Sequence, residues 1–144
     1  MGKVSIVYWS GTGNTEAMAA AMAEGAKDAG AEVELLTVDK AEAAALSEAK
    51  AFALGCPAMG AEELEEGEME PFMAELDSQI AGKTIALFGS YGWGGGEWMR
   101  DWESRVVSDG AAVLSGEGII ADNAPDDDVL AECRAAGAKL AALV

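Results

Sequence analysis

Short apolar runs alternate along the chain with stretches in which apolar residues recur at helical spacing. A buried strand reads as a continuous apolar run, whereas a helix that covers a sheet shows an apolar stripe with a period of 3.6 residues. We therefore expect strands at residues 3–9, 32–38, 50–56, 83–90 and 111–121. Helices are expected at residues 15–29, 68–79, 97–108 and 126–143, with a short helix or loop at 41–47. This alternation predicts a doubly wound α/β fold around a parallel sheet.

The order of these elements also predicts where a ligand would bind. In a doubly wound sheet, ligands bind beyond the carboxyl ends of the strands, at the point where the strand order reverses. Those ends fall after Trp9, Cys56, Ser90 and Ala121. The chain shows no internal repeat, linker or shift in composition, so residues 1–144 are expected to form a single domain.

The composition excludes several classes of function. The chain carries 26 acidic and 9 basic residues, a formal net charge of −17 at pH 7. Such a surface repels nucleic acids and anionic membranes and attracts basic protein partners. Histidine is absent, which excludes Ser/His and Cys/His catalysis and His-ligated metal sites. No apolar run reaches 18 residues and the N-terminus has no signal-peptide pattern, so we expect a cytoplasmic protein without membrane contact.

Some conspicuous residues are expected to serve the fold rather than a site. Cys56 and Cys133 share no short motif and are expected to be small buried thiols. Trp98 and Trp102 are four residues apart on an expected helix, which places both on its core-facing side. The run from Asp126 to Asp128 does not match a calcium-binding loop and is expected to stabilise the N-terminus of the last helix.

The segment SGTGNT, residues 10–15, joins the first expected strand to the first helix. It lacks the Lys of a P-loop, and Glu16 stands where the dinucleotide fingerprint GxGxxG has its third glycine. Backbone N–H groups and small polar side chains at a helix N-terminus can hold a phosphate without a cationic side chain. The residues of this segment are Ser10, Gly11, Thr12, Gly13, Asn14 and Thr15. The alternative is a simple N-capping turn, which is worth about 1 kcal/mol and needs no ligand.

Two further loops follow the third and fourth expected strands. In CPAMGAEELEE, Met59 is an apolar residue beside Gly60, whose conformational freedom would let the peptide between them flip between turn types. Alternatively, the side chain of Met59 packs in the hydrophobic core. In GSYGWGGGEW, Trp93 stands among glycines without a local packing partner, which suits an aromatic ring that covers a flat ligand or meets a partner. Tyr91 either belongs to that site or packs beneath it.

Together the three loops resemble the phosphate loop and the two flavin loops of short-chain flavodoxins. YWSGTGNTEAMA, GCPAMGAEELEE and FGSYGWGGGEWMRDWE match the family in residue type, order and spacing, and the likeness extends over essentially the whole chain. The resemblance implies a five-stranded parallel sheet in the order 2-1-3-4-5 with helices on both faces. It also implies non-covalent FMN as the cofactor and electron transfer as the role. The fifth strand is expected to run straight through residues 111–121, without the insertion of long-chain members.

The resemblance assigns roles to individual residues. The ribityl phosphate is expected at residues 10–15, and the flavin ring between Met59 on its inner face and Trp93 on its outer face. The peptide at Gly60 is expected to turn its carbonyl toward flavin N5 on reduction, and Glu62 to accept a hydrogen bond from N3–H. The remaining contacts are assigned to Pro57, Ala58, Ser90, Tyr91, Gly92 and, in the segment ADNAP, Asn123.

The charge around these loops favours a low-potential carrier. None of the three loops contains Lys or Arg, and residues 51–82 contain eight acids and no base. Adding negative charge to a flavin in that field, beside apolar Met and Trp side chains, is costly. We therefore expect a one-electron carrier, not an enzyme, that shuttles between semiquinone and hydroquinone and passes electrons between redox enzymes. Ala61 replaces a polar or acidic residue of many relatives in the redox-linked turn.

The acidic residues of the segment 62–70 border the same site. They are expected to steer the basic faces of reductases and electron acceptors into transient contact with a monomer. A signalling receiver domain would need acidic residues at the positions of Ser10 and Cys56, and a nicotinamide dehydrogenase is disfavoured by Glu16. Two alternatives remain open: an FMN-dependent quinone or NAD(P)H oxidoreductase of the same fold, and a flavodoxin-like protein dedicated to one metalloenzyme partner.

Overall fold

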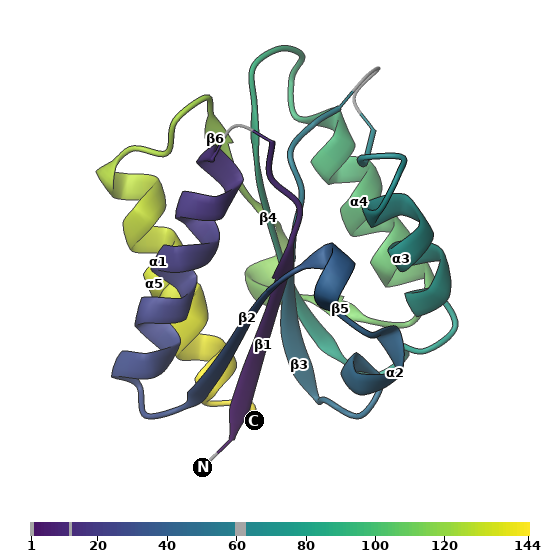
Figure 1. Cartoon of the computed structure of the whole chain (residues 1–144), viewed down its shortest axis with the longest axis vertical. Coiled ribbons are helices and arrows are strands. Elements are labelled where there is room, and N and C mark those ends of the chain that lie inside the picture. The colour runs from purple at the N-terminus through teal and green to yellow at the C-terminus, as the bar shows by residue number, and fades with distance from the viewer. Residues whose placement is uncertain (1, 12, 60–62) are drawn as a thin grey trace.

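A twisted parallel sheet runs through the middle of the molecule in this computed structural model, which describes residues 2–11, 13–59 and 63–144 (Figure 1). Its strands are β1 (Lys3–Tyr8), β2 (Glu32–Thr37), β3 (Ala51–Gly55), β4 (Thr84–Tyr91), β5 (Ala112–Val113) and β6 (Ile119–Asp122). The strand order is β2-β1-β3-β4-β5, and β6 also pairs with β4. The doubly wound class and the predicted order are therefore confirmed.

Helices cover both faces of this sheet. They are α1 (Asn14–Asp28), α2 (Ala43–Leu46), α3 (Met69–Leu76), α4 (Glu97–Ser108) and α5 (Asp127–Ala141), with short 3₁₀ turns η1 (Val38–Lys40) and η2 (Leu114–Gly116). Figure 1 shows α1 and α5 side by side on one face, and α3 and α4 on the other. The predicted helix at 97–108 agrees with α4 at both ends, whereas α3 is shorter than the predicted 68–79. Asp126 accepts a hydrogen bond from the backbone N–H of Val129, so the acidic run does cap α5 as predicted.

The prediction of one continuous strand at residues 111–121 is wrong. The turn η2 divides this segment into β5 and β6, which pair with different parts of β4. Ser115 and Gly116 adopt left-handed backbone conformations, with φ of 63° and 87°, and extended pairing cannot continue through them. Gly118 then lies so close to Met99 of α4 that any side chain there would collide with it. Two glycines in one expected strand were the signal of this break.

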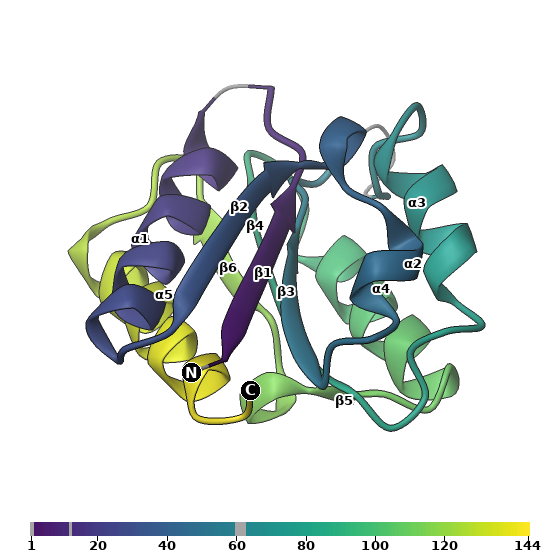
Figure 2. The ribbon, with the colours of Figure 1, turned by 60° about the horizontal axis from the view of Figure 1, so that its bottom comes forward.

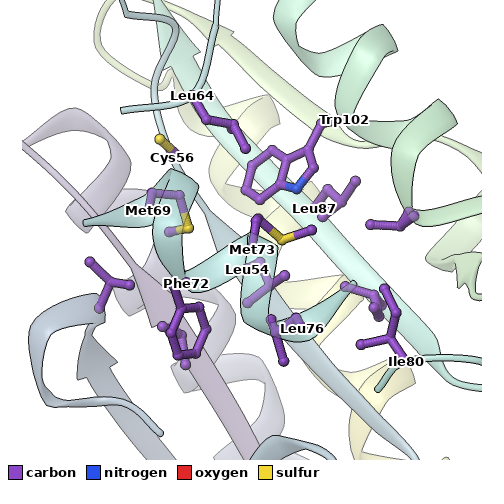
Figure 3. Close-up of a cluster of buried hydrophobic side chains, with 14 of the residues drawn as sticks. Leu54, Cys56, Leu64, Met69, Phe72, Met73, Leu76, Ile80, Leu87 and Trp102 are labelled. Atoms are coloured by element: carbon purple, nitrogen blue, oxygen red, sulfur yellow. The ribbon is translucent and has the colours of Figure 1, made fainter. Parts of the chain in front are cut away.

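Two hydrophobic cores hold the layers together. One lies between the sheet and α3 and α4, and Figure 3 shows part of it, with Trp102 and Met73 facing one another above Leu54. The other lies between the sheet and α1 and α5. Cys56 belongs to the first core and Cys133 to the second, and both are buried free thiols as predicted. Trp98 and Trp102 are also core residues as predicted, each only 1% exposed.

The parallel strands bring three loops to one end of the molecule. Because β1, β3 and β4 run in the same direction, the loops that follow them all leave the sheet at its carboxyl edge. Figure 2 shows β1 beside β3, with the segments that follow both strands at the upper edge of the sheet. The candidate site is formed at this edge.

Candidate cofactor site

A cavity of about 230 Å³ lies where the loops after β1, β3 and β4 meet. It is lined by Trp9, Gly11, Asn14, Pro57, Ala58, Met59, Ser90, Tyr91, Gly92, Trp93 and Asn123. All of these residues except Trp9 were predicted site residues. Hollows of about 330 and 410 Å³ lie elsewhere, but charged side chains such as Lys139 and Arg105 border them. An apolar and aromatic lining with few polar groups is what a flat organic ring requires, so the chemistry of the walls identifies the site.

The remaining predicted residues fall into two groups. Ser10, Gly13 and Thr15 lie in the loop beside the cavity but do not line it. Thr12, Gly60 and Glu62 lie outside the described residues, as does Ala61. The predicted flip of the Gly60 peptide and the predicted role of Glu62 therefore stay predictions.

The loop before α1 is held by hydrogen bonds to one hydroxyl. Gly13 is the N-cap residue with a left-handed φ of 94°, which glycine adopts without steric cost. The Oγ of Ser10 accepts from the backbone N–H of Gly13 at 3.1 Å and from that of Glu16 at 3.3 Å. The carboxylate of Glu16 accepts from the hydroxyl of Tyr8 at 3.0 Å, so this acid is bonded to β1. Asn14, the first residue of α1, lines the cavity, so the positive end of the helix dipole lies at the cavity edge.

Thr15 is buried beneath the loop rather than exposed to the cavity. Its Oγ1 lies 3.2 Å from the Oγ of Ser90 and also accepts from the backbone N–H of Ser90 at 3.3 Å. Only 1% of Thr15 is exposed. This pair joins residues 75 positions apart and fixes the start of α1 to the end of β4, so it holds two walls of the cavity in register.

The loop after β3 begins with a short antiparallel bridge. The backbone N–H of Met59 donates to the carbonyl of Glu63 at 2.9 Å, and the N–H of Glu63 donates to the carbonyl of Met59 at 2.9 Å. Met59 itself is half-buried and lines the cavity, so its side chain does not pack in the hydrophobic core. The bridge fixes both ends of the turn in which the redox-linked peptide is predicted to lie.

The loop after β4 supplies the opposite part of the lining. Trp93 is 51% exposed although it lines the cavity, as expected for a ring on a glycine-rich loop. Tyr91 does both of the things considered from sequence, because it lines the cavity and packs on Trp98 with ring centroids 5.5 Å apart. Asn123 donates its backbone N–H to the carbonyl of Tyr91 at 2.7 Å. A side chain at Gly92 would approach the Oδ1 of Asn123 to 3.2 Å, so glycine leaves room for this amide.

Trp9 is a lining residue that the sequence analysis did not assign. It follows β1 directly, and its backbone N–H donates to the carbonyl of Gly55 at 2.9 Å. Its indole N–H donates to the Oε1 of Glu68 at 3.2 Å. A large aromatic residue immediately before a small polar loop was the signal that could have identified it.

The charge around the cavity is negative or absent. None of the described residues that line it is basic. Next to it, the carboxylate of Glu65 accepts from the backbone N–H groups of Gly67, Glu68 and Met69 at 2.7 to 3.0 Å. Burial acts to raise the pKa of Glu65, but these hydrogen bonds hold that pKa below its usual value. The acid therefore remains ionised at neutral pH.

Fold and site together define a class: a doubly wound α/β protein with an aromatic-walled cavity beside a helix N-terminus, at the carboxyl edge of its sheet. Such a site can hold a flat ring on apolar walls and a single phosphate on backbone N–H groups, and FMN combines these two parts. The comparisons with known proteins agree, because the Flavodoxin family matches residues 6–137. The chain belongs to the flavodoxin family, and it is an FMN-binding electron carrier.

Individual relatives are similar over nearly their whole length. The chain is 47% identical to the flavodoxin of Megasphaera elsdenii over 92% of this chain and 98% of that one. It is 48% identical to the flavodoxin of Clostridium beijerinckii over 86% of this chain and 89% of that one. The solution structure of the two-electron reduced Megasphaera elsdenii flavodoxin superposes with a TM-score of 0.86, at 46% identity, over 94% of this chain and 98% of that one. Within the part of the chain that the structure describes, no helix is long and apolar enough to cross a membrane.

Proposed function

We propose that this carrier works at low potential, passing one electron at a time through FMN held between Met59 and Trp93. One observation carries the proposal: the described residues around the cavity include aromatic, sulfur and glycine groups but no basic side chain. FMN, when bound, can take up one or two electrons, and the protein around it decides which steps are favourable. Walls without a positive charge oppose the last electron, because it leaves a negative charge on the ring.

The phosphate is proposed to lie at the first turn of α1. Gly11 and Asn14 line the cavity, so their backbone N–H groups and the side-chain amide of Asn14 support this placement, together with the positive end of the helix dipole. Ser10 and Thr15 contribute by holding the loop, through the hydrogen bonds of Ser10 to Gly13 and Glu16 and of Thr15 to Ser90. A neutral cradle binds the phosphate without placing a cation near the ring.

The remaining part of the proposal is that the protein does not itself turn over a substrate. With Met59 and Trp93 on the two faces of the ring, only an edge would remain accessible, and an exposed edge supports electron transfer rather than hydride transfer. An FMN-dependent quinone or NAD(P)H oxidoreductase is the second candidate, and a protein dedicated to one metalloenzyme is a variant of the first. Steady-state assays with NADH, NADPH and quinones distinguish the candidates, because a pure carrier shows no turnover without a partner enzyme.

Partners are proposed to be redox enzymes with basic faces. The exposed acids Glu63 and Glu66 border a hollow that shares Met59 with the cofactor cavity, and the chain as a whole carries a formal net charge of −17. Such a surface accelerates encounters with a basic partner and makes them sensitive to salt. We further propose a cytoplasmic monomer; the two buried free thiols are consistent with a reducing compartment.

The experiment that tests the proposal is a stepwise dithionite titration of the FMN-loaded protein, followed by its visible spectrum. Two separate one-electron steps are expected, with the second potential below that of free FMN in the same buffer. A single two-electron step, or a second potential at or above that of free FMN, would contradict the low-potential role. Failure of the apoprotein to bind FMN would overturn the whole assignment.

A further inference from the structure

Trp9, which lines the cofactor cavity, is hydrogen-bonded to Glu68 of the acidic segment. The indole N–H of Trp9 donates to the Oε1 of Glu68 at 3.2 Å, although the two residues are 59 positions apart in the chain. Trp9 follows β1 directly and lines the cavity, whereas Glu68 is the N-cap residue of α3. This contact links the phosphate loop directly to the acidic segment that follows the predicted redox-linked turn.

We propose that Trp9 and Glu68 are a positioning pair that holds the phosphate loop in its FMN-binding form. The inference rests on the proposed placement of FMN in this cavity and deepens it, because it names residues that set the affinity for the phosphate end of the cofactor. Trp9 affects FMN binding by supporting the phosphate loop, and Glu68 affects it by orienting the ring of Trp9.

The indole ring of Trp9 supports the loop from one side. A Cβ at Gly11 would lie 3.1 Å from Cη2 and 3.4 Å from Cζ3 of this ring, so the loop backbone lies against the six-membered ring. The backbone of Trp9 is fixed by its N–H bond to Gly55. The direction of the ring is therefore set by its side-chain torsions, and the hydrogen bond to Glu68 selects one direction. If the ring turned away, the backbone at Gly11 would lose its support.

Glu68 can act in this way because its own position is fixed. Its backbone N–H donates to the Oε1 of Glu65 at 2.7 Å, and the N–H of Met69 donates to the same oxygen at 3.0 Å. The backbone N–H of Glu65 in turn donates to the Sγ of Cys56 at 3.4 Å, at the end of β3. Glu68, whose carboxylate accepts from the indole N–H, is thus linked through Glu65 to Cys56. Cys56 directly follows β3, the strand next to β1.

The acids of this segment consequently divide into two kinds. Glu65 and Glu68 accept hydrogen bonds that shape the site, whereas the side chain of Glu66, exposed as that of Glu68 is, makes no contact with Trp9. Glu66→Ala removes one exposed acid of the same segment, as Glu68→Ala does, but it leaves the contact with Trp9 intact. Glu66→Ala is therefore the matched control for Glu68→Ala.

The experiment measures the affinity of the apoprotein for FMN and for riboflavin, which lacks the phosphate, by the quenching of flavin fluorescence. The variants are Trp9→Phe, Glu68→Ala, Glu68→Gln, Glu66→Ala and the double variant Trp9→Phe/Glu68→Ala. We expect Trp9→Phe and Glu68→Ala each to weaken FMN binding about fivefold, as loss of one hydrogen bond does. Glu68→Gln should bind as the wild type does, because its amide oxygen still accepts. Riboflavin binding should change less than twofold throughout.

The double variant separates a pair from two independent effects. If Trp9 and Glu68 act together, the double variant binds FMN about as well as either single variant. Effects that multiply, a Glu68→Ala variant that matches Glu66→Ala, or equal losses for riboflavin and FMN would each overturn the inference. These results leave the electron-carrier role untouched, whereas a wild-type apoprotein that rejects FMN would overturn both.

Discussion

Arg105 on α4 makes a two-point hydrogen-bonded pair with Asp77 at the end of α3. The Nε of Arg105 donates to Oδ1 of Asp77 at 3.0 Å, and its Nη2 donates to Oδ2 at 2.8 Å. The third nitrogen, Nη1, donates to both carboxylate oxygens of Glu70 at 2.9 and 2.7 Å. These bonds join α3 to α4, the two helices that begin directly after the second and third loops of the site. Bidentate geometry gives this surface network more weight than an isolated ion pair has.

A second carboxyl group, that of Asp109, lies beside Asp77 and hydrogen-bonds to it when one of the two is protonated; its buried Oδ2 has no other hydrogen-bond partner. Burial, the hydrogen bond to Asp77 and the negative charge of Asp77 together raise the pKa of Asp109 to about 6. Burial acts to raise the pKa of Asp77 as well, but the hydrogen bonds from Arg105 and Asp109 bring it below its usual value. The two acids therefore share one proton in mildly acidic solution, and Arg105 faces both of them.

The first prediction is that the contribution of Asp109 to stability falls as the pH rises from 4 to 6. A group whose pKa is raised on folding stabilises the protein below its unfolded pKa, and that contribution is lost as the pH rises through the folded pKa. Asp109→Asn, whose amide donates to Asp77 at every pH, should remove this dependence. At pH 7 it should raise the free energy of unfolding by about 1 kcal/mol, since solvent screens part of the repulsion at this partly exposed pair.

Urea unfolding of the FMN-saturated protein between pH 4 and pH 7 measures this effect, and Asp28→Asn, on the exposed end of α1, is the control. Asp28→Asn should keep the wild-type pH dependence. If Asp109→Asn and the wild type show the same slope with pH, the two carboxyl groups do not share a proton.

The second prediction concerns the contact between α1 and α5. A Cβ at Gly25 would collide with the carbonyl oxygen of Arg134, and one at Gly137 would collide with that of Met22. Two helix backbones approach closely here, and neither can give way to a side chain without moving the whole helix. Gly25→Ala and Gly137→Ala should each lower the free energy of unfolding by about 1 to 3 kcal/mol, although alanine favours a helix. Gly95→Ala, with no atom within 4 Å of the added carbon, should cost much less.

Sequence alone located the sheet because its strands are buried on both faces. The core strands β1, β3 and β4 read as short, near-continuous apolar runs that alternate with helical patterns, and that alternation favours a parallel sheet covered on both faces. The limits of α4 were also predictable, since the stripe of Trp98 and Trp102 starts just after a glycine-rich loop. The segment 111–121 was misjudged because apolar content outweighed its two glycines, one of which adopts a left-handed backbone.

The site was predictable only as far as its loops. Residue types and spacing identified the segments that surround the cavity, because their order along the chain matches the phosphate loop and the two flavin loops of the flavodoxin family. The contacts that fix those loops were not predictable, since Thr15 pairs with Ser90 over 75 positions and Trp9 with Glu68 over 59. Side-chain hydrogen bonds between distant segments leave no periodic trace in a sequence.

The third prediction is that Glu65 stabilises α3 as well as the site. Its carboxylate accepts three backbone N–H groups at the helix start, which otherwise have no acceptor within the helix. Glu65→Ala should therefore lower the free energy of unfolding by about 1 to 2 kcal/mol, measured with urea at pH 7. Glu66→Ala, at the next and exposed position, should cost less than about 0.5 kcal/mol. Because the pKa of Glu65 is lowered on folding, the difference between the two variants should shrink as the pH falls below 4.5.

The fourth prediction concerns Asn123, which has a left-handed φ of 61° at the edge of the cofactor cavity. Asparagine tolerates this conformation better than most residues, and glycine adopts it freely. Asn123→Gly should therefore keep the stability of the wild type but bind FMN more weakly, because the amide that lines the cavity is lost. Asn123→Ala should lose the same affinity and in addition about 1 kcal/mol of stability from backbone strain. Fluorescence titration with FMN and urea unfolding of the apoproteins measure the two effects separately, and equal stability of the alanine and glycine variants would show that the backbone here is not strained.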